Sequence, residues 1–173
     1  RDANPAWGRL IDTLEDDPDH VLISVTEWSE YRNKRPIAKI MNVHNGLQKK
    51  GRVKVSAEVD GVFFTDEAGE IRVVTGIRQD LSARVDLLPV GSDNWRTLSA
   101  SKHTRDFFPV HVDAADGVVY ATDYMDEDLL GLYKLGLDGR SVERVFQHDR
   151  VDVTGASADD DGHLTAIRLD DGL

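Results

Sequence analysis

The chain has 173 residues, of which 40% are hydrophobic and 31% are charged, and it contains no cysteine. This length suffices for one domain with a sizeable core, but no apolar run approaches the roughly 20 residues that cross a bilayer, so we expect no membrane partner. The lack of cysteine excludes disulfides, thiolate metal sites and thiol catalysis. The net charge of −11 disfavours nucleic-acid binding. The acidic excess lies after residue 110, where 15 residues are acidic and 5 are basic.

The first predicted element is residues 7–14, where four apolar side chains have helical spacing: Trp7, Leu10, Ile11 and Leu14. A short helix and a first strand both fit this segment, and the sequence leaves the two open. Continuous helical periodicity over ten or more residues appears nowhere in the sequence. The rest of the chain is therefore predicted to be strands and turns.

Strands of similar kinds recur along the chain at a nearly constant spacing. The cores of one kind begin 50, 47 and 46 residues apart, at Val21, Ile71, Val118 and Leu164. Strands of a second kind end at turns spaced by 47 residues, after Val43, Val90 and Leu137. A short third strand follows each turn, at residues 47–50, 95–98 and 141–146. A fourth precedes the first kind in the later units, at residues 59–65, 107–112 and 151–154.

The turns between these strands are rich in Asn-Gly and Asp-Gly pairs. Asn45-Gly46 is followed along the chain by Asp-Gly at 60/61, 116/117, 138/139, 161/162 and 171/172. Such pairs tolerate the positive φ angles of two-residue type I′ turns, so they predict tight hairpins.

Four-stranded units that repeat every 40–50 residues are typical of β-propeller blades. The predicted fold is therefore all-β, a partial β-propeller of about three and a half four-stranded antiparallel blades in a single domain, residues 1–173. The blades are expected at about residues 8–54, 55–100 and 105–148, with an incomplete blade at 151–173. The next hairpin of this period would lie near residue 184, so we interpret the chain as a piece of a longer protein.

Six short motifs lie in order along these units. The first is Leu14-Glu15-Asp16-Asp17-Pro18-Asp19-His20-Val21-Leu22-Ile23, and the others occupy residues 40–46, 66–72, 95–98, 132–138 and 145–155. Their order and spacing resemble the propellers of bacterial peptidases of the prolyl oligopeptidase family. The resemblance implies an N-terminal propeller that covers a C-terminal α/β-hydrolase domain, with the catalytic serine, acid and histidine in that second domain.

The chain itself shows no catalytic, cofactor or metal motif, and we expect it to have no activity and no cofactor. Residues 155–159 come nearest to a nucleophile elbow, but Asp159 replaces the second glycine, and we expect Ser157 to lie in a turn between two strands with no helix after it. No two of the six histidines have the i, i+4 spacing of a helical zinc-binding motif. The acidic clusters at 126–128, 159–161 and 113/116 lack the ligand pattern of a calcium loop, and turn formation explains them.

Residues 27–36 form the most unusual predicted loop. Exposed aromatic and basic side chains of this kind are frequent in contacts with proteins or peptides, which makes Trp28, Tyr31, Arg32 and Arg35 a possible contact loop. The alternative is a loop that packs on its own blade. The other aromatic side chains at strand positions are expected to pack between blades: Trp95, Phe107, Phe108, Tyr120, Tyr124 and Tyr133.

The leading functional hypothesis is a non-catalytic propeller region that gates or positions peptide substrates for the hydrolase domain of a bacterial serine peptidase. The alternative is a propeller scaffold that binds a partner protein or ligand with no enzyme attached. A propeller enzyme with a site in the central channel is a third possibility, but no convergent carboxylate pair supports it. The compartment, periplasm or cytoplasm, stays open. Open blade edges also predict self-association of this chain.

Overall fold

The computed structural model describes residues 6–27, 35–50, 59–78, 80–103, 105–159 and 162–171. Their regular structure consists of fourteen β-strands and one short 3-10 helix, Ala100–Lys102. No helix in this part of the chain is long and apolar enough to cross a membrane. By its internal contacts the chain divides into two compact units, residues 1–84 and 85–173.

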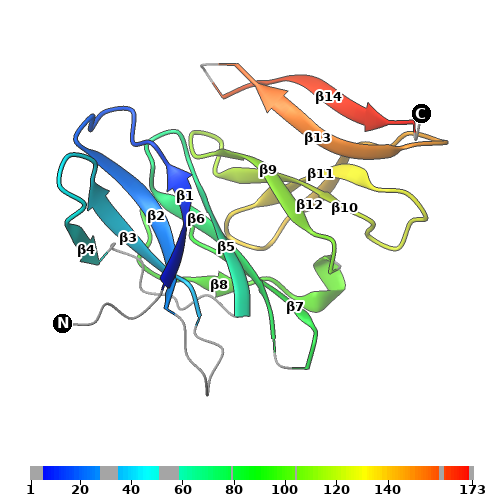
Figure 1. The fold of residues 1–173 in the computed structure, drawn as a ribbon. Helices are drawn as coiled ribbons and strands as arrows, with labels where there is room; N and C mark the ends of the chain where they lie inside the picture. Colours follow the sequence, from blue (N-terminus) through cyan, green and yellow to red (C-terminus); the bar gives the residue numbers. More distant parts are fainter. Residues whose placement is uncertain are drawn as a thin grey trace. The chain divides into compact units, whose positions relative to one another are not determined.

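The first sheet is an antiparallel meander in the order β1-β2-β3-β4 (Figure 1). Its strands are β1 (Ala6–Asp12), β2 (His20–Glu27), β3 (Ile37–Asn42) and β4 (Gln48–Lys50). Of the two structures considered for residues 7–14, the strand is present, because the β1 backbone pairs with β2 from Ala6↔Glu27 to Asp12↔Leu22. Two of the four apolar side chains, Trp7 and Leu10, stay 57% and 61% exposed on this strand.

The second sheet has the order β5-β6-β7-β8. Its strands are β5 (Val59–Thr65), β6 (Ile71–Ile77), β7 (Ala83–Leu87) and β8 (Arg96–Thr97), and the division between the two compact units falls within β7. Asp60-Gly61 does not form a turn as predicted. The pair lies inside β5, where the register with β6 shifts between Val59 and Val62, and one extra residue of β5 is accommodated as a bulge.

The third sheet has four strands and the fourth has two. The third contains β9 (Phe108–Asp113), β10 (Val118–Asp123), β11 (Gly131–Gly136) and β12 (Val142–Phe146), and the last contains β13 (Asp152–Ala158) and β14 (Leu164–Asp170). Ser157 lies inside β13, opposite Ala166, so the prediction that it occupies a turn is wrong. Backbone pairing with β14 extends β13 four residues beyond the predicted end at residue 154.

The hairpin turns are longer than the predicted type I′ turns. Among the described residues Gly46, Gly117 and Gly139 have positive φ angles, whereas Asn45, Asp116 and Asp138 before them do not. In the β11–β12 connection, Gly139 N donates to Gly136 O (2.8 Å) and Gly136 N donates to Ser141 O (3.1 Å). This is the longer hairpin connection in which a type I turn is followed by a left-handed glycine, so only the second residue of each pair needs a positive φ.

The central strands of the sheets form the cores. In the second compact unit most residues of β10 and β11 are buried, on both faces of the sheet, and their sequences are mostly apolar with one lysine, Lys134, in β11. Of the aromatic side chains expected between blades, Phe107 and Tyr133 are buried, at 6% and 4% exposed, but Phe108 is 56% exposed. The prediction is wrong for Phe108, whose side chain lies on the exposed side of β9 while that of the next residue, Pro109, is buried.

The fold class predicted from the sequence is confirmed. The chain is all-β, and its described residues form three four-stranded antiparallel sheets and a two-stranded one, the strand content of a partial β-propeller with three and a half blades. Each four-stranded sheet is a meander in chain order, as successive colours in Figure 1 show.

Candidate functional site

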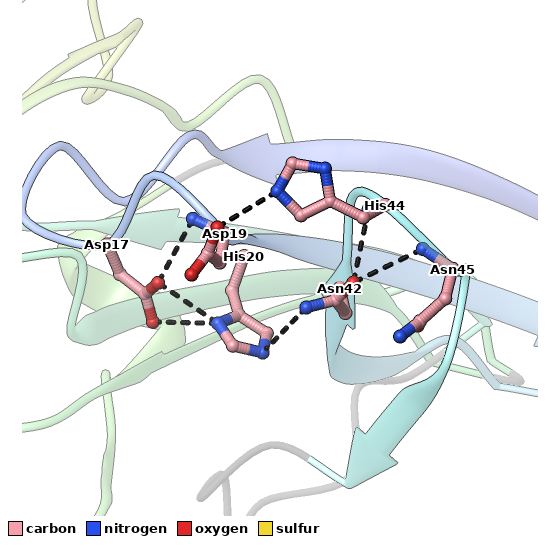
Figure 2. A network of polar contacts seen from close by, with 6 residues as sticks. All are labelled: Asp17, Asp19, His20, Asn42, His44 and Asn45. Carbon is pink, nitrogen blue, oxygen red and sulfur yellow. Dashed lines mark hydrogen bonds and ion pairs between the residues drawn. The ribbon is translucent and has the colours of Figure 1, made fainter.

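A polar network that joins separate segments lies at one end of the first sheet (Figure 2). His20 begins β2, and its Nδ1 lies 2.9 and 3.0 Å from the two carboxylate oxygens of Asp17. Its Nε2 lies 3.5 Å from Nδ2 of Asn42, the last residue of β3. The imidazole ring of His20 thus connects the turn before β2 to the end of the neighbouring strand, β3.

Asn42 connects this histidine to the next turn. Its Oδ1 accepts the backbone N–H groups of His44 (3.1 Å) and Asn45 (3.2 Å). The sequence favours this local structure, because asparagine readily accepts hydrogen bonds from backbone two or three residues ahead. Gly46 then supplies the positive φ of 69° that turns the chain toward β4.

A second acid–histidine pair lies beside the first. Nε2 of His44 is 2.9 Å from Oδ1 of Asp19, and Val43 N donates to the backbone oxygen of Asp19 at 2.9 Å. Both side chains of the pair are more than 60% exposed, so solvent weakens their attraction. The backbone bond is the firmer link between the two turns.

The electrostatics of the network are clearest at Asp17. The hydrogen bond with His20 is the main cause that lowers the pKa of this carboxyl, and desolvation opposes the shift. A carboxyl with a lowered pKa stabilises the folded state at neutral pH, and this contribution is lost as the pH falls through its folded pKa. The pair therefore helps to hold the turn before β2 at neutral pH.

An aspartate–histidine pair is also the base-orienting half of a catalytic triad, but here the second imidazole nitrogen meets an amide. Asn42 offers no nucleophile, whereas acyl transfer requires a hydroxyl or thiol at that position. Ser157, the closest match to a nucleophile in the sequence, lies in the other compact unit, within β13. The arrangement is suited to holding two turns together.

A pocket of about 320 Å³ opens between the end of β1 and the turn from β5 to β6. Its lining residues are Leu10, Ile11, Asp12, Thr13, Glu15, Asp66 and Glu67. Asp12 accepts from Thr65 Oγ1 (2.5 Å) and Leu14 N (2.7 Å). Each oxygen of the Asp12 carboxylate therefore accepts one of these hydrogen bonds, and the role of the side chain is structural.

Asp66 is the second structural acid of this pocket. Its buried carboxylate accepts from Ala68 N (3.1 Å), Glu70 N (2.9 Å) and Arg72 Nε (2.6 Å). The side chain of Asp66 is 1% exposed and that of Arg72 is 14% exposed. This pair closes the β5–β6 hairpin, and its contacts lie within the motif at residues 66–72.

Most of the predicted contact loop lies outside the described residues. This applies to Trp28, Tyr31 and Arg32, and Arg35 alone is described, as an exposed residue before β3. The choice between partner contact and local packing therefore stays a prediction.

Several residues of the acidic clusters bond to nearby backbone or to a basic side chain. Asp113 Oδ1 accepts from Asp116 N, Asp159 Oδ1 accepts from His163 N, and Glu127 pairs with Arg144 at 2.8 Å. In the described part of the chain no three histidine or acidic side chains are grouped as around a metal ion. Asp160 and Asp161 lie outside that part.

Two other histidines bind backbone carbonyl groups. His103, which is 6% exposed, has its Nδ1 2.9 Å from Ser99 O. His111 places its Nε2 2.9 Å from Gly162 O, and its ring stacks with Tyr120. In each case the ring nitrogen near the carbonyl oxygen is the donor, because a carbonyl oxygen only accepts.

Asn42 is the member of the network that sequence reasoning missed. The available signal was its place two and three residues before His44 and Asn45, a spacing that predicts backbone capping. Its contact with His20, 22 residues earlier, depends on the pairing of β2 with β3.

Comparison with protein families, curated proteins and solved structures finds no significant match to this chain.

Proposed function

We propose that this chain is the non-catalytic propeller region of a prolyl oligopeptidase-like serine peptidase. In this proposal it gates or positions peptide substrates for an α/β-hydrolase domain, which is its partner within the parent protein. The catalytic serine, acid and histidine belong to that domain, and the chain supplies a barrier and contacts.

The observation that carries the proposal is the network in Figure 2. The first motif of the resemblance contains Asp17 and His20, and the second contains Asn42 and His44. The contact of His20 with Asn42 and that of Asp19 with His44 join these two motifs. The residues that carry the resemblance are therefore the ones that hold this end of the blade, which favours a shared architecture over chance matches.

The third motif supports the proposal in the same way. Its first and last residues, Asp66 and Arg72, form the buried pair of the β5–β6 hairpin. The fifth, residues 132–138, covers most of β11 and the turn after it, where Gly136 and Ser141 close the hairpin. Each of these motifs coincides with a hairpin of its own sheet.

The coding sequence of the parent gene provides the first test. The proposal predicts that it continues past residue 173 into a segment with Gly-x-Ser-x-Gly, followed by an acid and a histidine. Further 47-residue repeats up to the stop codon, with no such segment, would contradict it and favour the propeller scaffold that binds a partner.

The second test is an assay of the chain itself with aminoacyl and prolyl chromogenic substrates. We expect no hydrolysis above the level of a mock purification, because the nucleophile lies in the partner domain. Ser157→Ala serves as the matched control. Hydrolysis that follows the chain through two unrelated purification steps would contradict the proposal, whether or not Ser157→Ala abolishes it.

A further inference from the structure

Asn42 has one orientation, because its two side-chain atoms meet different groups. Oδ1 accepts the backbone N–H groups of His44 and Asn45, so Nδ2 faces His20 Nε2 at 3.5 Å (Figure 2). An amide nitrogen only donates, which makes Nε2 of His20 the acceptor. That nitrogen therefore carries no hydrogen in this arrangement.

The other nitrogen of His20 meets an acceptor. Both carboxylate oxygens of Asp17 lie within 3.0 Å of Nδ1, and an ionised carboxylate only accepts. The two contacts together assign a neutral imidazole with its hydrogen on Nδ1. A second proton has only Nε2 to bind, where its hydrogen would point at the amide hydrogens of Asn42.

We propose that His20 is a pH-dependent latch between the turn before β2 and the turn from β3 to β4. Neutral His20 accepts a hydrogen bond from Nδ2 of Asn42 at its Nε2. This fixes the amide so that Oδ1 of Asn42 accepts the backbone N–H groups of His44 and Asn45. Protonated His20 stays with Asp17 but repels Nδ2 of Asn42. The amide then rotates, and the turn after β3 loses its side-chain acceptor.

The titratable groups that share the network with this ring are Asp17 on its own turn, and Asp19 and His44 beside it (Figure 2). Asp17 remains ionised while imidazoles titrate, because its pKa is held below the ordinary value. Protonation of His44 acts in the opposite direction, since a charged ring is drawn more strongly to Asp19, 2.9 Å away. The two histidines can therefore be separated by mutation.

The test follows the backbone amide resonance of Asn45 by NMR in the full chain, from about pH 8 to about pH 5, a range that brackets ordinary histidine titration. We expect a pH-dependent shift that persists in His44→Gln and is lost in His20→Gln. Glutamine at position 20 can still donate to Asp17 and accept from Asn42, but it does not titrate. It keeps both contacts and removes only the proton.

The imidazole nitrogens of the unmodified chain give a second readout, which needs no variant. At pH 8 the resonances of His20 should show a hydrogen on Nδ1 and none on Nε2. A hydrogen on Nε2 would overturn the proposal. So would an Asn45 shift that survives in His20→Gln and vanishes in His44→Gln, because the Asp19–His44 pair would then be its cause.

Discussion

Aspartate side chains stabilise several turns of this chain by accepting hydrogen bonds from nearby backbone N–H groups. Asp66, Asp113, Asp138 and Asp159 each accept at least one backbone N–H within four residues, and Asn42 does the same with its amide oxygen. This use of acidic residues could be predicted from sequence, because aspartate in turns commonly bonds to nearby backbone. The buried pairing of Asp66 with Arg72 could not, since it depends on burial of both side chains.

At the residue scale we expect Asp66→Asn to lower the free energy of unfolding by about 3 kcal/mol. The amide can keep the bonds from Ala68 and Glu70, but its nitrogen would face Arg72 Nε and leave the guanidinium without a counter-charge. Urea denaturation measures the change. Glu143→Gln, at an exposed position of β12, is the control and should cost less than about 0.5 kcal/mol. Equal effects would show that the Asp66–Arg72 pair contributes little.

The strands themselves were largely predictable, and their exact limits and turn types were not. The 47-residue period placed the repeated hairpins, because alternating apolar runs between glycine turns are a local property of the sequence. The longer turns and the bulge in β5 depend on how two strands align, as the shift between Val59 and Val62 shows. The formation of β1 (Ala6–Asp12) likewise depends on β2 as a pairing partner.

At the element scale the turn from β5 to β6 contains a tightly packed glycine. Gly69 has a φ of +71°, and a Cβ added there would lie 2.5 Å from Leu14 Cδ2; Gly46 has a φ of +69° with nothing within 4 Å of such a Cβ. We expect Gly46→Ala to cost about 1 kcal/mol, from backbone strain alone. Gly69→Ala should cost up to about 1 kcal/mol more, because the end of the Leu14 side chain must also move.

Urea denaturation of both alanine variants measures this difference. The double variant Leu14→Ala/Gly69→Ala tests its cause, since removal of the leucine side chain should abolish the excess cost of Gly69→Ala relative to the Leu14→Ala parent. If the two glycine variants cost the same, the contact with Leu14 has no energetic role.

The whole chain leaves apolar side chains on strands at the ends of sheets. Trp7 and Leu10 on β1 are 57% and 61% exposed, and Ile167 and Leu169 on β14 are 37% and 41% exposed. In the described residues β14 pairs with β13 alone. Exposed strand edges with apolar side chains favour pairing with another chain.

At the scale of the whole molecule we expect the 173-residue chain to self-associate, with a mass by light scattering that rises with concentration. Leu169→Lys should shift the chain toward monomer, because a charge on the edge strand opposes strand addition. Leu81→Lys is the matched control, an exposed leucine in the turn after β6, and should change the mass little. A strictly monomeric chain at high concentration would contradict the prediction.

The sequence by itself determined the all-β class, the repeat and the approximate positions of the strands after β1, because these follow from local alternation, turn residues and spacing. Only the tertiary structure decided that β1 is a strand, that Asp66 is buried with Arg72, and that His20 meets Asn42. Those contacts join residues that become neighbours only when strands pair in a particular register. A one-residue change of that register would turn a side chain to the other face of its sheet, and sequence spacing alone does not specify it.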